Sequence, residues 1–249
     1  KRSRKYSEKE KKIVSYHEAG HAVIGIKLEN ADVVQKVTIV PRGEAGGYNL
    51  MTPEEERFLQ TKSALLDTIT GLLAGRVAEE LFIGEITTGA HNDFQKATAI
   101  ARAMVTEYGM SKLGVIQYER RAGEVFLGRD YMKDKNFSDQ VALEIDEATR
   151  EIINDCYNKA KQVLTDNKDL VVLIAEHLME IETLTKEDIY ELVNTGKLAW
   201  WERKKAKEEA ERIAKEKEEE LQQIYRKQLE AMEEVRKKEE NNNDDNETR

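Results

Sequence analysis

The chain has 249 residues, of which 36% are charged and 39% are hydrophobic, and its formal net charge is −9. The negative net charge argues against nucleic-acid binding, for which the contact surface is normally basic. The charged fraction is above the usual ~25%, which indicates an extended solvated segment rather than a charged interior. The single cysteine, Cys156, excludes an internal disulfide framework, and no apolar run approaches the ~18 residues that cross a bilayer. The composition therefore favours a globular protein with an additional charged, solvated segment.

The first predicted element is a helix that begins after Ser7. The segment from Ser7 to Glu10 has the serine and glutamate of a capping box, in which each side chain binds an end N–H group of the other. Apolar residues and histidines then recur in steps of three and four over residues 13–28, which predicts one inward face. Gly20 lies inside this helix, where glycine costs roughly 0.5–1 kcal/mol relative to alanine, so we expect another backbone to pass very close there.

Two strands and two helices are expected next. Residues 33–40 are rich in β-branched side chains and predict a strand, and a second short strand is expected near residues 47–51. The segment Thr52-Pro-Glu-Glu55 has the composition of a helix N-terminus. Longer helices are predicted at residues 62–82 and 92–108.

The rest of the chain reads as helical. From Ser138 an apolar stripe at helical spacing predicts a long helix in which Cys156 is a buried, inert residue. Further helices are expected near residues 170–179 and after Thr185, which we interpret as an N-cap.

A change of composition separates the last fifty residues from the rest. Residues 200–249 contain 16 acidic and 13 basic side chains and only a thin apolar line. This pattern is typical of a solvated charged helix, with a partner-binding helix as the alternative. Residues 241–249 are so polar that we expect disorder.

The stretch His17-Glu-Ala-Gly-His21 carries the most specific chemical signal. Residues four apart on a helix project to the same side, so both imidazoles can reach one Zn²⁺. Glu18 lies about 100° away around the helix, where it can accept a proton from a zinc-bound water. The alternative is a pair of core histidines bonded to carbonyls, but without a metal that pair beside an ionisable group is costly to bury.

A catalytic zinc needs a third protein ligand. Four residues outside the first helix are candidates: Asp93, His91, Glu79 and Glu80. His91 and Asp93 are two residues apart at a helix start, so both cannot easily bind one ion. The pattern of residues does not choose among the four candidates.

Five sequence blocks in order between residues 7 and 195 together resemble one family. The blocks are YHEAGHAVIG, KVTIVPRGEAGGY, GLLAGRVAEELFIGE, TTGAHNDFQKATAIARAMVTEYGMS and GEVFLGR. They are similar to the peptidase domain of the FtsH family, the membrane-anchored, ATP-dependent zinc proteases of bacteria, mitochondria and chloroplasts.

The resemblance implies a role for each candidate residue. The family's zinc ligands correspond to His17, His21 and Asp93, and its catalytic base corresponds to Glu18. Glu79 and Glu80 then have supporting or structural roles.

The resemblance also implies the wider organisation. It implies a mainly α, helical zincin-like metalloprotease domain with a small β-sheet, over residues 7–198, preceded by a linker at residues 1–6. From the composition, and not from the resemblance, we expect a charged helix at 199–240 and a disordered tail at 241–249 to follow. The family's ATPase module and membrane-spanning segments lie upstream and are missing from the printed sequence, so we expect this part to be soluble.

Several partners follow from the same resemblance. We expect one Zn²⁺ per chain, polypeptide substrates that are unfolded, misassembled or regulatory, and a homohexamer. ATP would be used only by the missing module, and a membrane would be reached only through the missing segments, with the peptidase on the cytoplasmic side of the cell membrane or its organelle equivalent.

Substrate binding and alternative functions complete the expectations. The strand containing Gly47, Tyr48 and Asn49 is expected to pair with an extended substrate along its edge. The alternatives are a non-catalytic, hexamer-forming assembly domain with a structural metal, and an unrelated zincin acting on peptides or amides.

Overall fold

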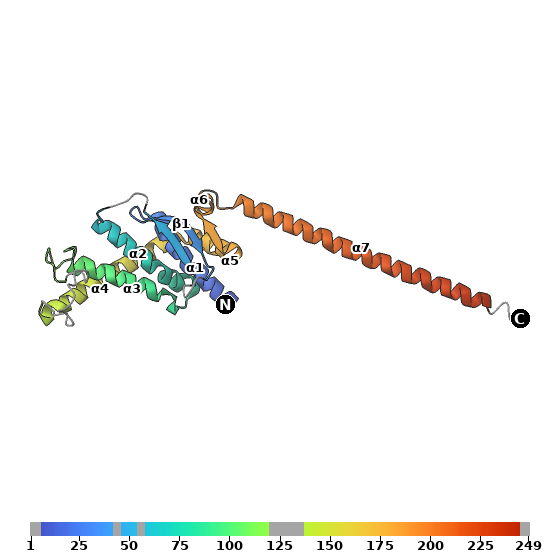
Figure 1. The fold of residues 1–249 in the computed structure, drawn as a ribbon, viewed down its shortest axis with the longest axis horizontal. Helices are drawn as coiled ribbons and strands as arrows, with labels where there is room; N and C mark the ends of the chain where they lie inside the picture. The colour runs from blue at the N-terminus through green and yellow to red at the C-terminus, as the bar shows by residue number, and fades with distance from the viewer. Residues whose placement is uncertain (1–5, 42–45, 54–57, 120–136, 245–249) are drawn as a thin grey trace, which may run out of the picture. The chain divides into compact units, whose positions relative to one another are not determined.

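The structure is a computed structural model that describes residues 6–41, 46–53, 58–119 and 137–244, with side chains described up to residue 233. The block GEVFLGR, most of the predicted N-terminal linker and the final residues 245–249 lie outside this part. The chain divides into two compact units, Lys1–Gly196 and Lys197–Arg249. The prediction of a mainly helical fold with a small sheet is confirmed (Figure 1).

The elements follow one another in a simple order along the chain. They are α1 (Glu8–Lys27), β1 (Val33–Thr38), β2 (Tyr48–Thr52), α2 (Lys62–Ala78), the π-helical turn η1 (Glu79–Ile83), the 3₁₀ turn η2 (Thr88–Ala90), α3 (His91–Thr106), α4 (Asp139–Asp166), α5 (Lys168–Ile181), β3 (Thr183–Thr185), α6 (Lys186–Thr195) and α7 (Ala199–Asp244).

Helix α1 begins as predicted, with a capping box at its N-terminus. The Glu10 N–H donates to Ser7 Oγ at 3.2 Å, and the Ser7 N–H donates to Glu10 Oε2 at 2.9 Å. The expectation of a single inward face is wrong, because all ten residues from 15 to 24 are buried. Helices α2 and α5 and strands β1 and β2 all pack against α1 and bury the middle of the helix.

Helix α1 lies in close contact with α2 at Gly20. A Cβ atom at this position would lie 2.7 Å from Ala74 O and 2.7 Å from Ala78 Cβ. Contacts this short are not tolerated, so only glycine allows the two helices to approach as they do. The prediction of a backbone passing close to Gly20 is confirmed.

The sheet is antiparallel and has the strand order β2–β1–β3. The two predicted strands correspond to β1 and β2, and β2 forms one edge. Strand β3 was not expected, because three residues are too few to produce a recognisable alternation. The predicted helix start at Thr52 is wrong, because Thr52 is the last residue of β2 and Pro53 is not helical, while Glu55 lies outside the described residues. Helix α2 begins instead after Thr61, whose side chain caps it.

One buried hydrophobic cluster of the first unit lies between helices α2, α3 and α4. Cys156 of α4 is buried as predicted, and burial raises the pKa of its thiol. Its buried neighbours come from α2 and α3 and comprise Leu65, Ile69, Leu73, Ala97, Ala101 and Met104. This packing fixes α3 against α2 and therefore fixes the start of α3 relative to α1.

The connection from α2 to α3 has two special turns. The last residues of α2 run into η1, which closes with a hydrogen bond from the Gly84 N–H to Glu79 O at 3.0 Å. Gly84 then takes a left-handed conformation with φ of 75°. Thr87 caps the short η2 turn through a bond from the Gly89 N–H at 3.1 Å, and α3 follows directly.

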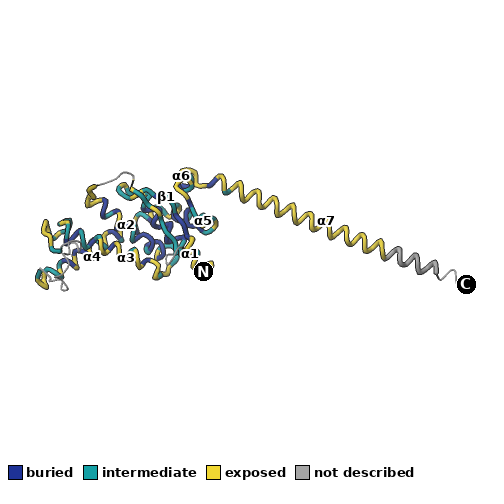
Figure 2. Tube along the Cα trace, in the orientation of Figure 1, coloured by how far each residue is buried: buried dark blue, intermediate teal, exposed yellow. Residues whose placement is uncertain are grey.

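The second unit consists mainly of the 46-residue helix α7. Every residue from 202 to 233 is exposed, as expected for a solvated charged helix (Figure 2). The helix continues to Asp244, past the predicted helix end at residue 240. No helix in the described part of the chain is long and apolar enough to cross a membrane.

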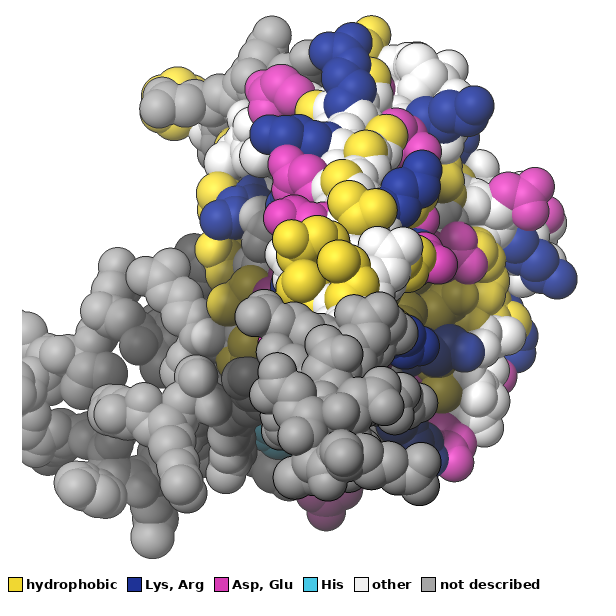
Figure 3. Space-filling model, turned by 90° about the vertical axis from the view of Figure 1, so that its right-hand side faces the viewer, with side chains coloured by type: hydrophobic (Ala, Val, Ile, Leu, Met, Phe, Trp, Pro, Cys, Tyr) yellow, Lys and Arg dark blue, Asp and Glu magenta, His cyan; other side chains and the backbone are white. Residues whose placement is uncertain are grey.

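Charges of both signs are mixed on the surface that Figure 3 shows. Lys and Arg side chains lie between Asp and Glu side chains and do not gather into one basic area on that face.

Candidate metal centre and catalytic base

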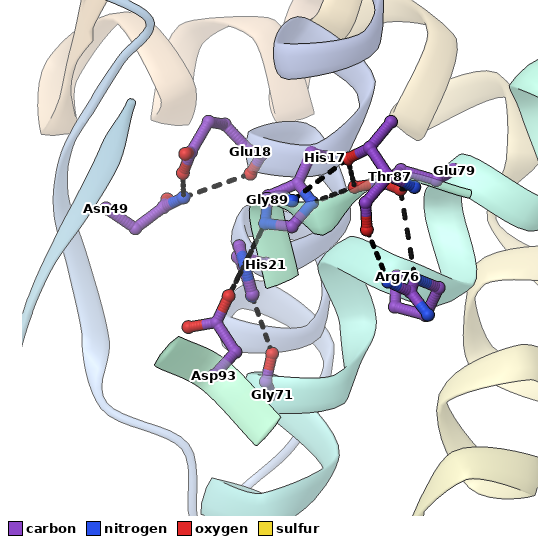
Figure 4. Close-up of polar contacts among 10 residues, drawn as sticks. All are labelled: His17, Glu18, His21, Asn49, Gly71, Arg76, Glu79, Thr87, Gly89 and Asp93. Atoms are coloured by element: carbon purple, nitrogen blue, oxygen red, sulfur yellow. Dashed lines mark hydrogen bonds and ion pairs between the residues drawn. The ribbon is translucent and has the colours of Figure 1, made fainter. Parts of the chain in front are cut away.

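Three side chains from two distant parts of the chain meet beside α1. His17 and His21 project from α1, and Asp93 projects from the first turn of α3 (Figure 4). The two Nε2 atoms are 3.1 Å apart. Asp93 Oδ2 is 3.5 Å from His17 Nε2 and 3.6 Å from His21 Nε2. The three atoms therefore form a nearly equilateral triangle.

The hydrogen bond made by Nδ1 of each imidazole determines whether its Nε2 atom donates or accepts. His21 Nδ1 lies 2.7 Å from the backbone oxygen of Gly71, which can only accept, so this Nδ1 carries a proton. His17 Nδ1 lies 2.7 Å from Glu79 Oε1, and the same reasoning applies to a carboxylate. In the neutral rings both Nε2 atoms are then acceptors, and they face each other and a carboxylate oxygen. Three converging acceptors require a cation between them.

The triangle has the size that a zinc ion needs. Tetrahedral zinc with bonds of ~2.0–2.1 Å holds its ligand atoms about 3.3 Å apart. The observed separations lie between 3.1 and 3.6 Å. Two imidazoles and one carboxylate are also a known donor set for catalytic zinc, which keeps its fourth position open for water. The residues present therefore fit the expected ion.

The other candidate ligands lie elsewhere. His91 is exposed and is not part of the triangle. Glu80 faces away, where it accepts hydrogen bonds from Tyr157 and from Lys161 Nζ, the latter at 2.8 Å. Glu79 contacts the far nitrogen of His17. Among the described residues, only Asp93 joins the two histidines in one cluster.

Glu79 supports His17 from inside the protein. Its Oε2 accepts a hydrogen bond from the Thr87 N–H at 2.7 Å, and its Oε1 accepts one from Thr87 Oγ1 at 3.2 Å. Burial alone would raise the pKa of Glu79, but the bonds from His17 and Thr87 lower it. The side chain therefore stays ionised, fixes the His17 tautomer and increases the basicity of Nε2.

Gly75 of α2 makes room for both imidazoles. A Cβ atom at Gly75 would lie 2.4 Å from His17 Nε2 and 2.6 Å from His21 Nε2. Nothing in the local sequence marks this glycine, because its function depends on the close packing of α2 against α1.

Glu18 is buried beside the triangle, with its carboxylate directed toward β2 (Figure 4). Burial raises its pKa, while His21, His17 and the hydrogen bond from Asn49 partly oppose the change. A carboxylate with a raised pKa binds a proton more readily, which is the property of a general base that works near neutral pH.

Without a metal ion, a proton on His17 supplies the positive charge between the three acceptor atoms. Burial alone would lower the pKa of His17, but Asp93 and Glu79 outweigh it and raise the pKa to about 9. The pKa of Asp93 is lowered: burial would raise it, but the hydrogen bonds from His17 and His21 prevail. A protonated His17 beside an ionised Asp93 is therefore the metal-free state at neutral pH.

Zinc binding is expected to be weaker at lower pH. Because zinc must displace the proton of His17, we expect the apparent affinity to rise about tenfold per pH unit and to level off near the His17 pKa of about 9. Asp93 is already ionised across this range and adds no slope. Competition with a chromophoric chelator between pH 6.5 and 9.5 measures this dependence, and a flat profile would contradict it.

Two of the three residues of the predicted substrate strand, Gly47 and Asn49, lie against the base Glu18. Gly47 immediately precedes β2, and Tyr48 and Asn49 belong to it. The Asn49 Nδ2 group donates to Glu18 Oε2 at 2.6 Å. Sequence reasoning missed this contact, since it requires knowing which face of β2 lies against α1.

Comparisons with known proteins agree with this geometry. Residues 4–192 match the family described as Peptidase family M41. The chain is 60% identical over 85% of its length to an ATP-dependent zinc metalloprotease FtsH of Acholeplasma laidlawii, covering 33% of that protein. It is 58% identical over 80% of its length to the FtsH of Bacillus subtilis, covering 31%. A relative from Aster yellows witches'-broom phytoplasma is 56% identical over 82% of the chain, which covers 29% of it. The chain thus spans about a third of the length of these curated relatives.

Proposed function

The chain belongs to peptidase family M41, and from this membership we propose that it is the zinc-dependent endopeptidase domain of an ATP-dependent, membrane-associated protease. One observation carries the proposal: His17, His21 and Asp93 present three acceptor atoms 3.1–3.6 Å apart beside a buried glutamate. A structural zinc is normally closed by four protein ligands. Three ligands with a neighbouring base favour catalysis over an idle metal.

In this proposal each side chain has one task. His17, His21 and Asp93 hold Zn²⁺, which when bound lowers the pKa of water toward neutrality and polarises the substrate carbonyl. Glu18 takes the proton of the attacking water at its carboxylate and later delivers it to the leaving amine. Glu79 keeps His17 oriented throughout. Gly47, Tyr48 and Asn49 belong to the strand that pairs with extended substrate.

The properties of the whole protein extend this proposal. The relatives' names describe ATP-dependent zinc metalloproteases. We infer that an ATPase module and a membrane anchor outside this sequence supply unfolding and location, and that the peptidase acts as a homohexamer on unfolded, misassembled or regulatory proteins. We also propose that residues 7–198 form the peptidase domain and that residues 199–240 form a charged helical extension.

Metal removal and restoration test the proposed activity. We expect the zinc-loaded chain to cleave an unfolded protein such as casein, and chelator treatment to abolish cleavage. Added Zn²⁺ should restore it. Zinc retained without any cleavage would favour the assembly-domain alternative. A tightly folded protein should resist cleavage, because the ATPase module that we propose to unfold substrates lies outside this sequence.

A further inference from the structure

Strand β2 reaches the side chain that we assign as the base. Asn49 Nδ2 lies 2.6 Å from Glu18 Oε2 and 3.1 Å from the backbone oxygen of Glu18 (Figure 4). A side-chain amide has two N–H donors. Asn49 therefore uses both donors on one residue, binding its carboxylate and its main chain together.

The orientation of the Asn49 amide is fixed by its neighbours. The backbone oxygen of Glu18 can only accept, so reversing the amide would place two acceptors 3.1 Å apart. The orientation that remains leaves Asn49 Oδ1 buried and without a hydrogen-bond partner among the described residues. An unsatisfied buried acceptor lowers stability. A residue that served only the packing of the sheet would not need to accept this loss.

The second oxygen of the same carboxylate lies against Gly47. A Cβ atom at Gly47 would be 2.7 Å from Glu18 Oε1 and 2.8 Å from Thr38 O. Residues two apart on an extended segment project to the same face. Gly47 and Asn49 together therefore enclose the carboxylate, one by leaving space for Oε1 and the other by binding Oε2.

We propose that Asn49 is a positioning residue that holds the Glu18 carboxylate in the orientation in which it takes the proton from water. The inference rests on the proposed peptidase function. It also means that one strand both aligns the base and supplies the edge expected to bind substrate.

Steady-state kinetics on an unstructured fluorogenic peptide test the proposal, with the zinc-loaded full chain. Asn49→Ala should lower kcat about tenfold to a hundredfold, with an unchanged zinc content and little change in KM. Asn49→Asp keeps the shape but loses both N–H donors, so kcat should fall at least as far. Asn49→Gln keeps the amide and should recover part of the activity.

Gln35→Ala is the matched control. Gln35 Nε2 donates to Thr52 Oγ1 at 2.9 Å, so this variant also removes a side-chain amide bond between β1 and β2, but away from Glu18. Its kcat should equal that of the unmodified chain.

Each other outcome has a defined meaning. Unchanged kcat in Asn49→Ala, full activity in Asn49→Asp, or an equal loss in Gln35→Ala would overturn the positioning role alone. Failure of the unmodified, zinc-loaded chain to cleave any peptide would overturn the proposed function, and this role with it.

Discussion

Replacing Glu18 by glutamine should abolish proteolysis while leaving the metal in place. An amide has the same shape as the carboxylate but cannot take a proton from water, and general base catalysis contributes about 10²- to 10⁴-fold. We therefore expect kcat to fall by about this factor. Because Glu18 is not one of the three converging ligands, zinc content by metal analysis should remain one per chain.

A second glutamate on the same helix is the control. Glu8 lies in the exposed first turn of α1, so Glu8→Gln removes a charge without touching the site. Its cleavage rate should match that of the unmodified chain. Substantial cleavage by Glu18→Gln with full zinc occupancy would mean that another group accepts the proton.

Replacing Gly75 by alanine should disrupt zinc binding itself. The added Cβ would lie 2.4 Å from His17 Nε2 and 2.6 Å from His21 Nε2, so both rings must move or α2 must withdraw from α1. Losing the hydrogen bond that orients a metal ligand typically lowers metal affinity about 10- to 100-fold, and displacing the ligand itself should lower it at least as much. We therefore expect zinc affinity to fall about 10- to 100-fold or more. Titration with zinc in the presence of a competing chelator measures the loss.

Gly71→Ala separates this effect from the general effect of a Gly-to-Ala change in α2. A Cβ at Gly71 would meet only Ile24 Cγ2, at an ordinary 3.7 Å, and the carbonyl that binds His21 is retained. This variant should keep its zinc and gain about 0.4–1 kcal/mol in unfolding free energy. Wild-type zinc affinity in Gly75→Ala would show that the imidazoles can shift without loss.

Features encoded in short stretches could be predicted from the sequence. Ser7 and Thr185 act as N-caps as expected, because capping depends on residues three apart. The spacing of His17 and His21 predicted that both imidazoles would point to one side of a helix. The strands at residues 33–40 and 47–51 were found from their composition alone.

Features that join distant parts of the chain could not be predicted in the same way. No periodicity distinguishes Asp93 from the three other candidate ligands, and only the resemblance to a family singled it out. The contacts of Gly75 and Asn49 depend on which faces of α2 and β2 lie against α1. The complete burial of residues 15–24 likewise depends on the surrounding elements and not on α1 itself.

The π-helical turn at Glu79–Ile83 makes this part of the chain sensitive to insertions and deletions. It holds one residue more per turn than an α-helix, and it lies between Gly75, which admits the imidazoles, and the segment that carries Asp93. Losing a single residue would restore the ordinary helical phase and rotate the direction in which the chain leaves this turn by about 100°. A change in the number of residues here would therefore move the third ligand relative to the other two.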